Sequence, residues 1–182
     1  MSLTILDTET NDLLKPLGTP LNQQPHMLEI CAMRFDNSHK LIKEFTTYVK
    51  PETPFIMSPK AFKANGITPA TLKDAPSFAE IYKELVGMFL GSHTIIAHNL
   101  SFDKEILVNE LRRIGKEFSF PYPPINFCTV EQSLHVKGYR LKNSDLYKMA
   151  TGKEIENAHT AKADVLATWD GYKWLVKRKI GK

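Results

Sequence analysis

Two apolar segments separated by a polar turn place the strongest constraint on the fold of this chain. The segments cover residues 27–35 and 41–49, and residues 36–39 between them are of the types that favour turns. This pattern predicts an antiparallel β-hairpin. A purely parallel nucleotide-binding sheet is therefore disfavoured, because a hairpin makes part of the sheet antiparallel.

Shorter apolar segments flank the hairpin and alternate with helical patterns. We expect further strands at residues 2–8, 93–97 and 125–128. Capping residues mark the starts of three expected helices: one follows the capping box of Ser77 and Glu80, one runs from Ser101 as N-cap to Gly115, and one runs from Thr160 as N-cap to about 179. We expect shorter helices at residues 58–65, 130–136 and 143–150. A hairpin followed by alternating strands and helices predicts an α/β fold, with a mixed sheet and helices on both faces.

Length and composition are ordinary for a globular protein. With 182 residues, of which 42% are hydrophobic, we expect one domain over residues 1–182 with a basic C-terminal tail from about residue 177. The net charge of +4 is compatible with a polyanionic partner. Cys31 and Cys128 lie in apolar segments and are typical of buried thiols in a reducing compartment. We see neither a signal peptide nor an apolar segment of the ~20 residues needed to span a bilayer, so we expect a cytoplasmic protein with no membrane partner.

Two carboxylates follow the first strand. Asp7 and Glu9 are two residues apart, so on a strand they point to the same face. Two carboxylates at the edge of a core repel each other and resist desolvation, and a cation between them would remove both penalties. On these two residues alone, an ordinary solvated end of a strand is the better explanation.

Further acids lie where other apolar elements end or begin. Asp103 falls in the first turn of the helix after the strand at 93–97, and Asp164 lies near the start of the last helix, five residues after His159. Four carboxylates from three segments suit two Mg²⁺ ions, which prefer oxygen ligands and assist phosphodiester hydrolysis in pairs about 3.5–4 Å apart. A neutral histidine nearby can take the proton of the attacking water. The signatures of common rivals, such as the P-loop, do not occur in the sequence.

Three short motifs resemble, in order and spacing, those of a known family. They are Asp7-Thr8-Glu9, the segment from His98 to Asp103, and the segment from His159 to Asp164. Together they resemble the exonuclease motifs of the DEDDh family, the DnaQ-like 3′→5′ exonucleases that include the proofreading subunit of bacterial replicative polymerase. Weaker similarities at residues 28–30 and 65–68 extend the resemblance over about residues 2–176.

The resemblance implies a ribonuclease H-like fold with a five-stranded mixed sheet, and a site for two divalent cations, Mg²⁺ or Mn²⁺. Asp7 would bridge both ions. Glu9 and Asp164 would hold the ion that carries the nucleophilic water, and Asp103 would support the second ion. His159 would act as the general base.

The resemblance also implies residues that contact the substrate. They are Thr8, Thr10, Leu13, Asn65, Asn99 and Phe102. Thr8 and Thr10 would act through backbone or hydroxyl groups, and Phe102 through its aromatic face. Asn99 would also brace the loop that carries Asp103.

The chain departs from the family pattern just after the first motif. Asn-Asp at residues 11–12 replaces the usual Thr-Gly, and the loop over residues 11–25 is long. The residue that contacts the terminal base is therefore left open between Leu13 and Leu14. Asn65 replaces the usual His of the family's His-Gly-Ile-Thr segment, and we expect this to affect a substrate contact and no metal ligand.

These features predict a metal-dependent 3′→5′ exonuclease that releases nucleoside 5′-monophosphates from single-stranded 3′ ends of DNA. An exoribonuclease acting on RNA ends or short oligoribonucleotides is the alternative, because no segment identifies a pocket that reads the 2′-hydroxyl. A catalytically silent nucleic-acid or polymerase-binding module is disfavoured by the intact set of four acids and His159. If the protein proofreads, we expect a polymerase partner in trans.

Overall fold

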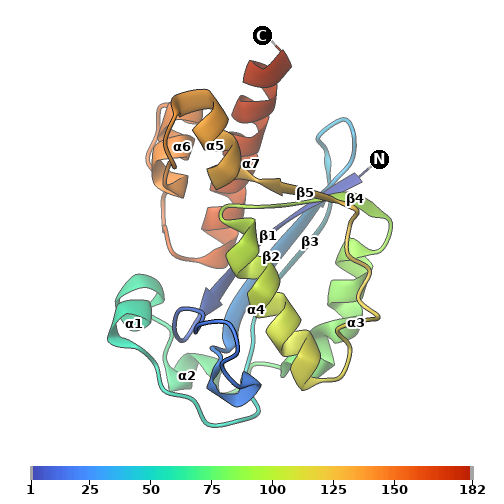
Figure 1. The fold of residues 1–182 in the computed structure, drawn as a ribbon, viewed down its shortest axis with the longest axis vertical. Coiled ribbons are helices and arrows are strands. Elements are labelled where there is room, and N and C mark those ends of the chain that lie inside the picture. Colours follow the sequence, from blue (N-terminus) through green and yellow to red (C-terminus); the bar gives the residue numbers. More distant parts are fainter. Residues whose placement is uncertain (1, 181–182) are drawn as a thin grey trace.

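A five-stranded mixed sheet forms the centre of the computed structural model, which describes residues 2–180 (Figure 1). The strands are β1 (Ser2–Thr10), β2 (Met27–Phe35), β3 (Leu41–Tyr48), β4 (Ser92–Ala97) and β5 (Ile125–Cys128), in the order β3-β2-β1-β4-β5. The first three strands pair antiparallel, and β4 and β5 extend the sheet parallel to β1. The predicted hairpin and mixed sheet are confirmed.

One carboxylate shapes the hairpin turn. An oxygen of Asp36 accepts hydrogen bonds from the Ser38 N–H, the Ser38 hydroxyl and the Lys40 N–H, at 2.8, 2.6 and 2.9 Å. His39 takes a left-handed φ of 66° in the same turn. Asp is favoured in turns because its short side chain can bond the backbone two residues further on. The polar segment thus helps to set the register of β2 against β3.

Helices connect the strands at the places that the sequence indicates. In the described part of the chain they are α1 (Pro59–Asn65), α2 (Pro69–Leu72), α3 (Phe78–Phe89), α4 (Leu100–Arg113), α5 (Thr129–Lys137), α6 (Asn143–Thr151) and α7 (Ala161–Ile180), with a 3₁₀ turn, η1 (Leu21–Gln23). Ser77 and Glu80 form the predicted capping box of α3. The Thr160 hydroxyl accepts a hydrogen bond from the Ala163 N–H at 3.4 Å, as expected for the N-cap of α7. α2 and η1 were not predicted, because an element of one turn leaves no periodic pattern.

The start of α4 differs from the prediction. Ser101 is not the N-cap, because α4 begins at Leu100 and is preceded by Asn99 with a left-handed φ of 71°. The Ser101 hydroxyl instead donates to the Asn99 Oδ1 at 3.4 Å. Asn tolerates the left-handed region better than most residues, so the chain turns before Ser101 is reached. Asp103 still falls in the first turn of the helix.

Helices cover both faces of the sheet, as predicted (Figure 1). α3 and α4 pack on the face that carries Leu6 of β1, and α7 packs on the face that carries Ile5. Side chains alternate along a strand, so Asp7 and Glu9 point to the α7 face. Thr8 points to the α4 face. The end of β1 can therefore receive groups from α7 on one side and from α4 on the other.

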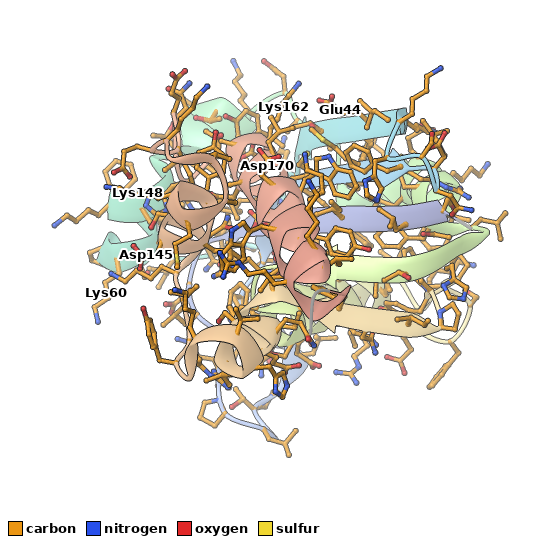
Figure 2. The ribbon with its side chains drawn as sticks, turned by 90° about the horizontal axis from the view of Figure 1, so that it is seen from above. Glu44, Lys60, Asp145, Lys148, Lys162 and Asp170 are labelled. Atoms are coloured by element: carbon orange, nitrogen blue, oxygen red, sulfur yellow. The ribbon has the colours of Figure 1, made fainter. Side chains whose placement is uncertain are left out.

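α7 is fixed to the sheet and to α6. Near its start, Lys162 forms an ion pair with Glu44 of the edge strand β3 at 2.6 Å (Figure 2). Further along, a Cβ atom at Gly171 would lie 2.6 Å from the Cδ2 atom of Leu146 on α6, so a larger residue at 171 would displace the Leu146 side chain. Leu146 is fully buried there. The short separation of the two helices brings the start of α6 beside α7.

The predicted basic tail is the last turn of α7 in the structure. Lys177 and Arg178 are exposed, and the Arg178 guanidinium lies 4.1 Å from the centre of the Trp174 ring. Residues 181–182 of the tail lie outside the described residues. Within the described residues, no helix has the length and apolar character needed to cross a membrane.

Candidate active site

Three carboxylates from two elements meet at the end of β1. One oxygen from each of Asp7, Glu9 and Asp164 lies within 4.8 Å of the other two. β1 presents the first two on one face because they are two residues apart. α7 packs on that face and contributes Asp164 from its first turn. The structure therefore brings these three predicted residues together.

Asp103 approaches from the α4 side of the same strand. Its Oδ1 accepts hydrogen bonds from the Thr8 backbone N–H at 3.0 Å and from the Thr8 hydroxyl at 2.9 Å. The pairing of β1 with β4 ends at Ile5 and Ile96, so the N–H of Thr8 needs another acceptor. Asp103 is 3% exposed. It lies outside the group of three carboxylates and faces them across β1.

Burial and the neighbouring negative charges raise the pKa values of Asp7, Glu9 and Asp103. The pKa of Asp7 lies well above its ordinary value, first because it is buried and then because of the charges of Asp103 and Asp164. Burial raises the pKa of Glu9 to about 8 and the pKa of Asp103 to about 7. Among the side chains that the structure describes, no ion pair brings a positive charge to any of the four. Clustered, partly buried carboxylate oxygens without a positive partner suit a hard divalent cation such as Mg²⁺ or Mn²⁺.

These pKa values predict how pH and metal should affect the stability of the protein. When folding raises the pKa of an acid, its contribution to the free energy of unfolding depends on pH. The contribution is fully present below the pKa of the acid in the unfolded chain, and it is lost as the pH rises through the pKa in the folded protein. The interval runs from 4.5 to about 8 for Glu9 and from 3.8 to about 7 for Asp103. We expect the melting temperature of the metal-free protein to fall over this interval, and Mg²⁺ to raise it more at the alkaline end. Thermal unfolding with and without Mg²⁺ measures this, and an equal metal effect at both ends would contradict it.

Two N–H groups hold the carboxylate of Asp164. The Asn143 Nδ2 donates to its Oδ1 at 3.2 Å, and the His159 backbone N–H donates to its Oδ2 at 3.0 Å. His159 lies in the turn before α7, is exposed, and has a left-handed φ of 69°. The predicted histidine is therefore next to the predicted ligand, outside the helix. Its role as general base stays a prediction.

Glu29 is a buried acid beside the site. It was not among the site residues predicted from the sequence. It lies opposite Glu9 on β2 and is 7% exposed. Its Oε2 accepts a hydrogen bond at 3.3 Å from the N–H of Ala161, the first residue of α7. Helix N-termini favour carboxylates because their first N–H groups lack partners, so Glu29 holds the start of α7 on the sheet. An acid inside the largely apolar segment 27–35 is the signal that could have identified it.

Asn65 contacts a predicted metal ligand, which corrects the expectation from the sequence. Its Nδ2 donates to the Glu9 Oε2 at 3.3 Å and to the Thr10 carbonyl oxygen at 3.1 Å. Its Oδ1 accepts from the Ile67 N–H at 3.0 Å. The side chain therefore links the end of α1 to the end of β1. The expectation was wrong because a contact between residues 56 positions apart leaves no local pattern in the sequence.

Two predicted substrate residues on β1 bind partners within the protein. Both donors of Thr8 are directed to Asp103. The Thr10 hydroxyl donates to the Asp12 carbonyl oxygen at 2.7 Å. Both threonines are 7% exposed. These contacts make the threonines supports of the site in the described structure, and contact with a nucleotide stays a prediction.

The structure separates the two leucines between which the sequence left a choice. Leu13 is 68% exposed, whereas Leu14 packs against the core under α3 and α4. Phe102 is half-buried against the same core. Asn99 forms the turn that leads into α4. Leu13 is therefore the leucine that is free to meet a ligand.

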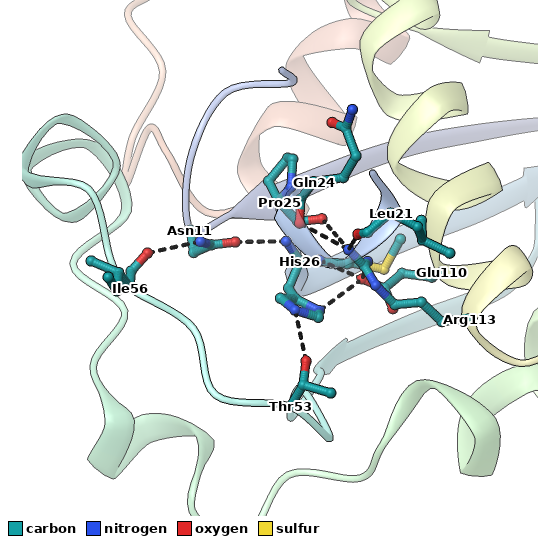
Figure 3. Close-up of polar contacts among 10 residues, drawn as sticks. Asn11, Leu21, Gln24, Pro25, His26, Thr53, Ile56, Glu110 and Arg113 are labelled. Atoms are coloured by element: carbon teal, nitrogen blue, oxygen red, sulfur yellow. Dashed lines mark hydrogen bonds and ion pairs between the residues drawn. The ribbon is translucent and has the colours of Figure 1, made fainter. Parts of the chain in front are cut away.

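Asn11 ties both ends of the loop after β1 together (Figure 3). Its Oδ1 accepts from the His26 N–H at 2.6 Å, and its own N–H donates to the His26 carbonyl oxygen at 3.3 Å. Its Nδ2 donates to the Ile56 carbonyl oxygen at 2.8 Å, and its carbonyl accepts from the Ser58 N–H at 2.9 Å. The loop over residues 11–25 thus has a fixed base beside the segment that leads into α1.

Glu110 and Arg113 of α4 complete this base (Figure 3). The Glu110 Oε1 pairs with the Arg113 Nη1 at 2.6 Å, accepts from the Met27 N–H at 3.0 Å and lies 3.5 Å from the His26 Nδ1. The Arg113 Nη2 donates to three carbonyl oxygens at 3.1, 2.9 and 3.2 Å, those of Leu21, Gln24 and Pro25. The loop over residues 11–25, where this chain departs from the family pattern, is therefore anchored to α4.

Known proteins match the sequence over most of its length. The model of the RNase_T family, described as exonuclease, matches residues 4–172. DNA polymerase III subunit epsilon of Buchnera aphidicola is 32% identical over 160 residues, which cover 86% of this chain and 65% of that protein. The protein of the same name from Escherichia coli is 30% identical over 158 residues, which cover 85% of this chain and 61% of that protein. The chain thus spans slightly less than two thirds of the length of these relatives.

Solved structures share the fold. Escherichia coli exonuclease I in complex with an oligonucleotide aligns with a TM-score of 0.73 at 23% identity, over 98% of this chain and 41% of that chain. The nuclease domain of 3′hExo, a DEDDh family member bound to rAMP, aligns with a TM-score of 0.74 at 14% identity, over 97% of this chain and 92% of that chain. At these identities the similarity concerns the fold alone. Together with the family match, it shows that the chain belongs to the RNase T/DEDDh exonuclease family and has its ribonuclease H-like fold.

Proposed function

We propose that this chain is a divalent-metal-dependent 3′→5′ exonuclease that releases nucleoside 5′-monophosphates from single-stranded DNA ends. The observation that carries the proposal is the meeting of Asp7, Glu9 and Asp164 at the end of β1, with Asp103 across the strand. Membership of the exonuclease family supports the reaction type. The relatives named DNA polymerase III subunit epsilon, at 32% and 30% identity, support DNA as the substrate.

The four acids would hold two Mg²⁺ or Mn²⁺ ions. Bound ions of this kind supply an activated water and stabilise the charge that develops on a phosphodiester during hydrolysis. Asp7 is suited to serve both ions, because the charges of Asp103 and Asp164 act on it more strongly than those of the other acids. Glu9 and Asp164 would hold the ion on the α7 side, and Asp103 would support the ion on the α4 side.

His159 would accept the proton of the attacking water. Its contact with Asp164 uses the backbone N–H and leaves the imidazole free for this task. The exposed position of His159 lets the ring pass the proton to solvent after each turnover. Its place directly before α7 keeps it beside Asp164.

Leu13, Asn99 and Phe102 would contact the terminal nucleotide. Leu13 is exposed on the anchored loop, and Phe102 keeps part of its ring accessible. Asn65 would act on the substrate through Glu9, whose carboxylate it holds. The threonines of β1 would act mainly through the groups that they bind.

The direct test uses 5′-labelled single-stranded DNA and RNA of the same base sequence, with Mg²⁺, with Mn²⁺ or with EDTA. We expect stepwise shortening of DNA from the 3′ end that EDTA stops. No shortening of either polymer with metal present would overturn the proposal. Faster loss of RNA than of DNA would favour the exoribonuclease alternative.

A polymerase is the proposed protein partner, because the relatives at 32% and 30% identity are named as polymerase subunits. The polymerase would be a separate chain and would bind a surface of this protein that leaves the acidic site open. Co-purification with a replicative polymerase after mixing would support this partner, and absence of a complex at micromolar concentrations would argue against it.

Replacing His159 should lower the rate and leave metal binding intact. We expect a loss of about 10²–10⁴-fold in kcat, the usual contribution of a general base. Metal binding should persist because the bond from residue 159 to Asp164 comes from the backbone. His159→Asn tests this without backbone strain, because Asn tolerates the left-handed φ of 69° at this position.

The matched control for this test is His135→Ala, which removes an exposed histidine from the last turn of α5. It should leave the rate unchanged. A loss of Mn²⁺ affinity in His159→Asn, in place of a loss of rate, would show that His159 is a metal ligand.

A further inference from the structure

We infer that Asn143, at the start of α6, is a positioning residue that holds the Asp164 carboxylate in its metal-binding orientation. Neither its place in the sequence nor the three motifs mark it. The inference rests on the proposed function, because it assigns a task at the same site. It adds α6, which contributes no acid to the site, to the elements on which the site depends.

The contacts of Asn143 fix both ends of its amide. Its Nδ2 donates to the Asp164 Oδ1 at 3.2 Å and to the Asp164 carbonyl oxygen at 3.1 Å. Its Oδ1 accepts from the hydroxyl of Thr168, which is fully buried, at 3.3 Å. A carboxylate and a carbonyl require a donor, so the amide has only one orientation that satisfies all these groups.

The contacts leave the Asp164 carboxylate partly free. Each of its oxygens receives one N–H, from Asn143 on Oδ1 and from His159 on Oδ2. An ionised carboxylate can accept about four hydrogen bonds or equivalent ligand contacts, so each oxygen keeps capacity for a cation. Both donors are neutral and do not compete with a cation by charge. The carboxylate is therefore oriented without being neutralised.

The packing of α6 on α7 keeps Asn143 in place. On α7, Asp164, Thr168 and Gly171 follow the i, i+4, i+7 spacing of one helical face. On α6, Asn143 and Leu146 are three residues apart and face this row. Leu146 fills the space that Gly171 leaves, where a Cβ atom would come within 2.6 Å.

The paired contacts form a two-point attachment. One point is apolar, between Leu146 and Gly171, and one is polar, at Asn143. The apolar point fixes the separation of the helices, and the polar point lies one turn nearer to the acids. A change at Asn143 should therefore affect metal binding more than folding.

The test is the Asn143→Leu variant, in which a side chain of similar size has no donors. Mn²⁺ alone is titrated into the metal-free protein by calorimetry. We expect at least about 10-fold weaker Mn²⁺ binding, since loss of a group that orients a metal ligand typically costs 10–100-fold in affinity or activity. In the DNA assay, the Mn²⁺ concentration for half-maximal rate should rise similarly, while KM for the oligonucleotide at saturating Mn²⁺ stays unchanged.

Two further variants separate orientation from folding. Thr151→Val removes a hydroxyl that bonds the Tyr147 carbonyl and the Lys153 N–H at the far end of α6, and this variant should bind Mn²⁺ like the wild type. Thr168→Val keeps the shape of a buried side chain but releases the Asn143 Oδ1, and should weaken Mn²⁺ binding less than Asn143→Leu does. It also tests the inference if Asn143→Leu fails to fold.

The outcomes distinguish this inference from the proposed function. If neither Asn143→Leu nor Thr168→Val weakens Mn²⁺ binding while the wild type binds normally, the inference is overturned and the proposed function stands. If the wild type itself binds no Mn²⁺, the proposed function fails and the inference fails with it. An increase in KM for the oligonucleotide with unchanged Mn²⁺ binding would make Asn143 a substrate contact and would also overturn the inference.

Discussion

The Asp7→Asn variant is expected to lose at least about 10³-fold in kcat while the metal-free protein becomes more stable. Electrostatic stabilisation by bound metal is worth several kcal/mol in the transition state, and about 4 kcal/mol corresponds to this factor. Stability should rise because burial and the charges of Asp103 and Asp164 oppose ionisation of Asp7 in the folded protein. An amide of the same shape removes that repulsion without leaving a cavity.

Hydrolysis of labelled DNA and thermal unfolding in EDTA at alkaline pH measure the two effects of Asp7→Asn. Asp74→Asn is the matched control, because Asp74 is exposed in the turn after α2 and its replacement should change neither the rate nor the melting temperature. A rate near that of the wild type would remove Asp7 from the site. A lower melting temperature in EDTA would show that the Asp7 carboxylate stabilises the fold, contrary to the proposed electrostatics.

The Glu110→Ala variant is expected to show the largest loss of stability. Its free energy of unfolding should fall by about 3–5 kcal/mol, the usual result of removing one partner of a buried ion pair. Glu110 is 5% exposed, and its loss leaves the Arg113 charge without its carboxylate and the Met27 N–H without an acceptor. Arg113 retains its three carbonyl partners, which places the expected cost near the lower end of the range. The base of the loop over residues 11–25 should loosen with it.

Urea unfolding measures this cost, and Glu105→Ala on the same helix is the matched control. Glu105 pairs with Arg112 at 3.3 Å, and both side chains are about half exposed, so its removal should cost no more than about 1 kcal/mol. A change below about 1 kcal/mol for Glu110→Ala would mean that the polar network in Figure 3 does not anchor the loop.

Local patterns in the sequence explain much of the fold and of the acid cluster. The period of a strand places Asp7 and Glu9 on one face, and capping residues such as Ser77 mark where helices begin. The start of α4 was misplaced by two residues, with the N-cap at Asn99 and not at Ser101, because Asn99 takes a left-handed conformation that no neighbouring residue signals. Local rules therefore describe the elements and the direction of their side chains.

The supports of the site depend on contacts between distant residues, which local patterns do not contain. Asn143 and Asp164 are 21 positions apart, and Glu29 and Ala161 are 132 apart. The approach of α6 to α7 follows from the missing side chain of Gly171, and its partner Leu146 appears only when the helices are packed. The contacts that give these residues their roles became visible only in the structure.

The central claim is that the acids at the end of β1 form a site for two divalent cations. The most direct test titrates Mn²⁺ by calorimetry into metal-free protein at alkaline pH, in the presence of a nucleoside 5′-monophosphate, for the wild type and for Asp7→Asn. The proposed site predicts two Mn²⁺ ions per wild-type chain and loss of this binding in the variant, because Asp7 belongs to the group of three carboxylates and is also close enough to feel the charge of Asp103. Binding of no ion by the wild type, or of two ions with equal affinity by both proteins, would contradict the claim.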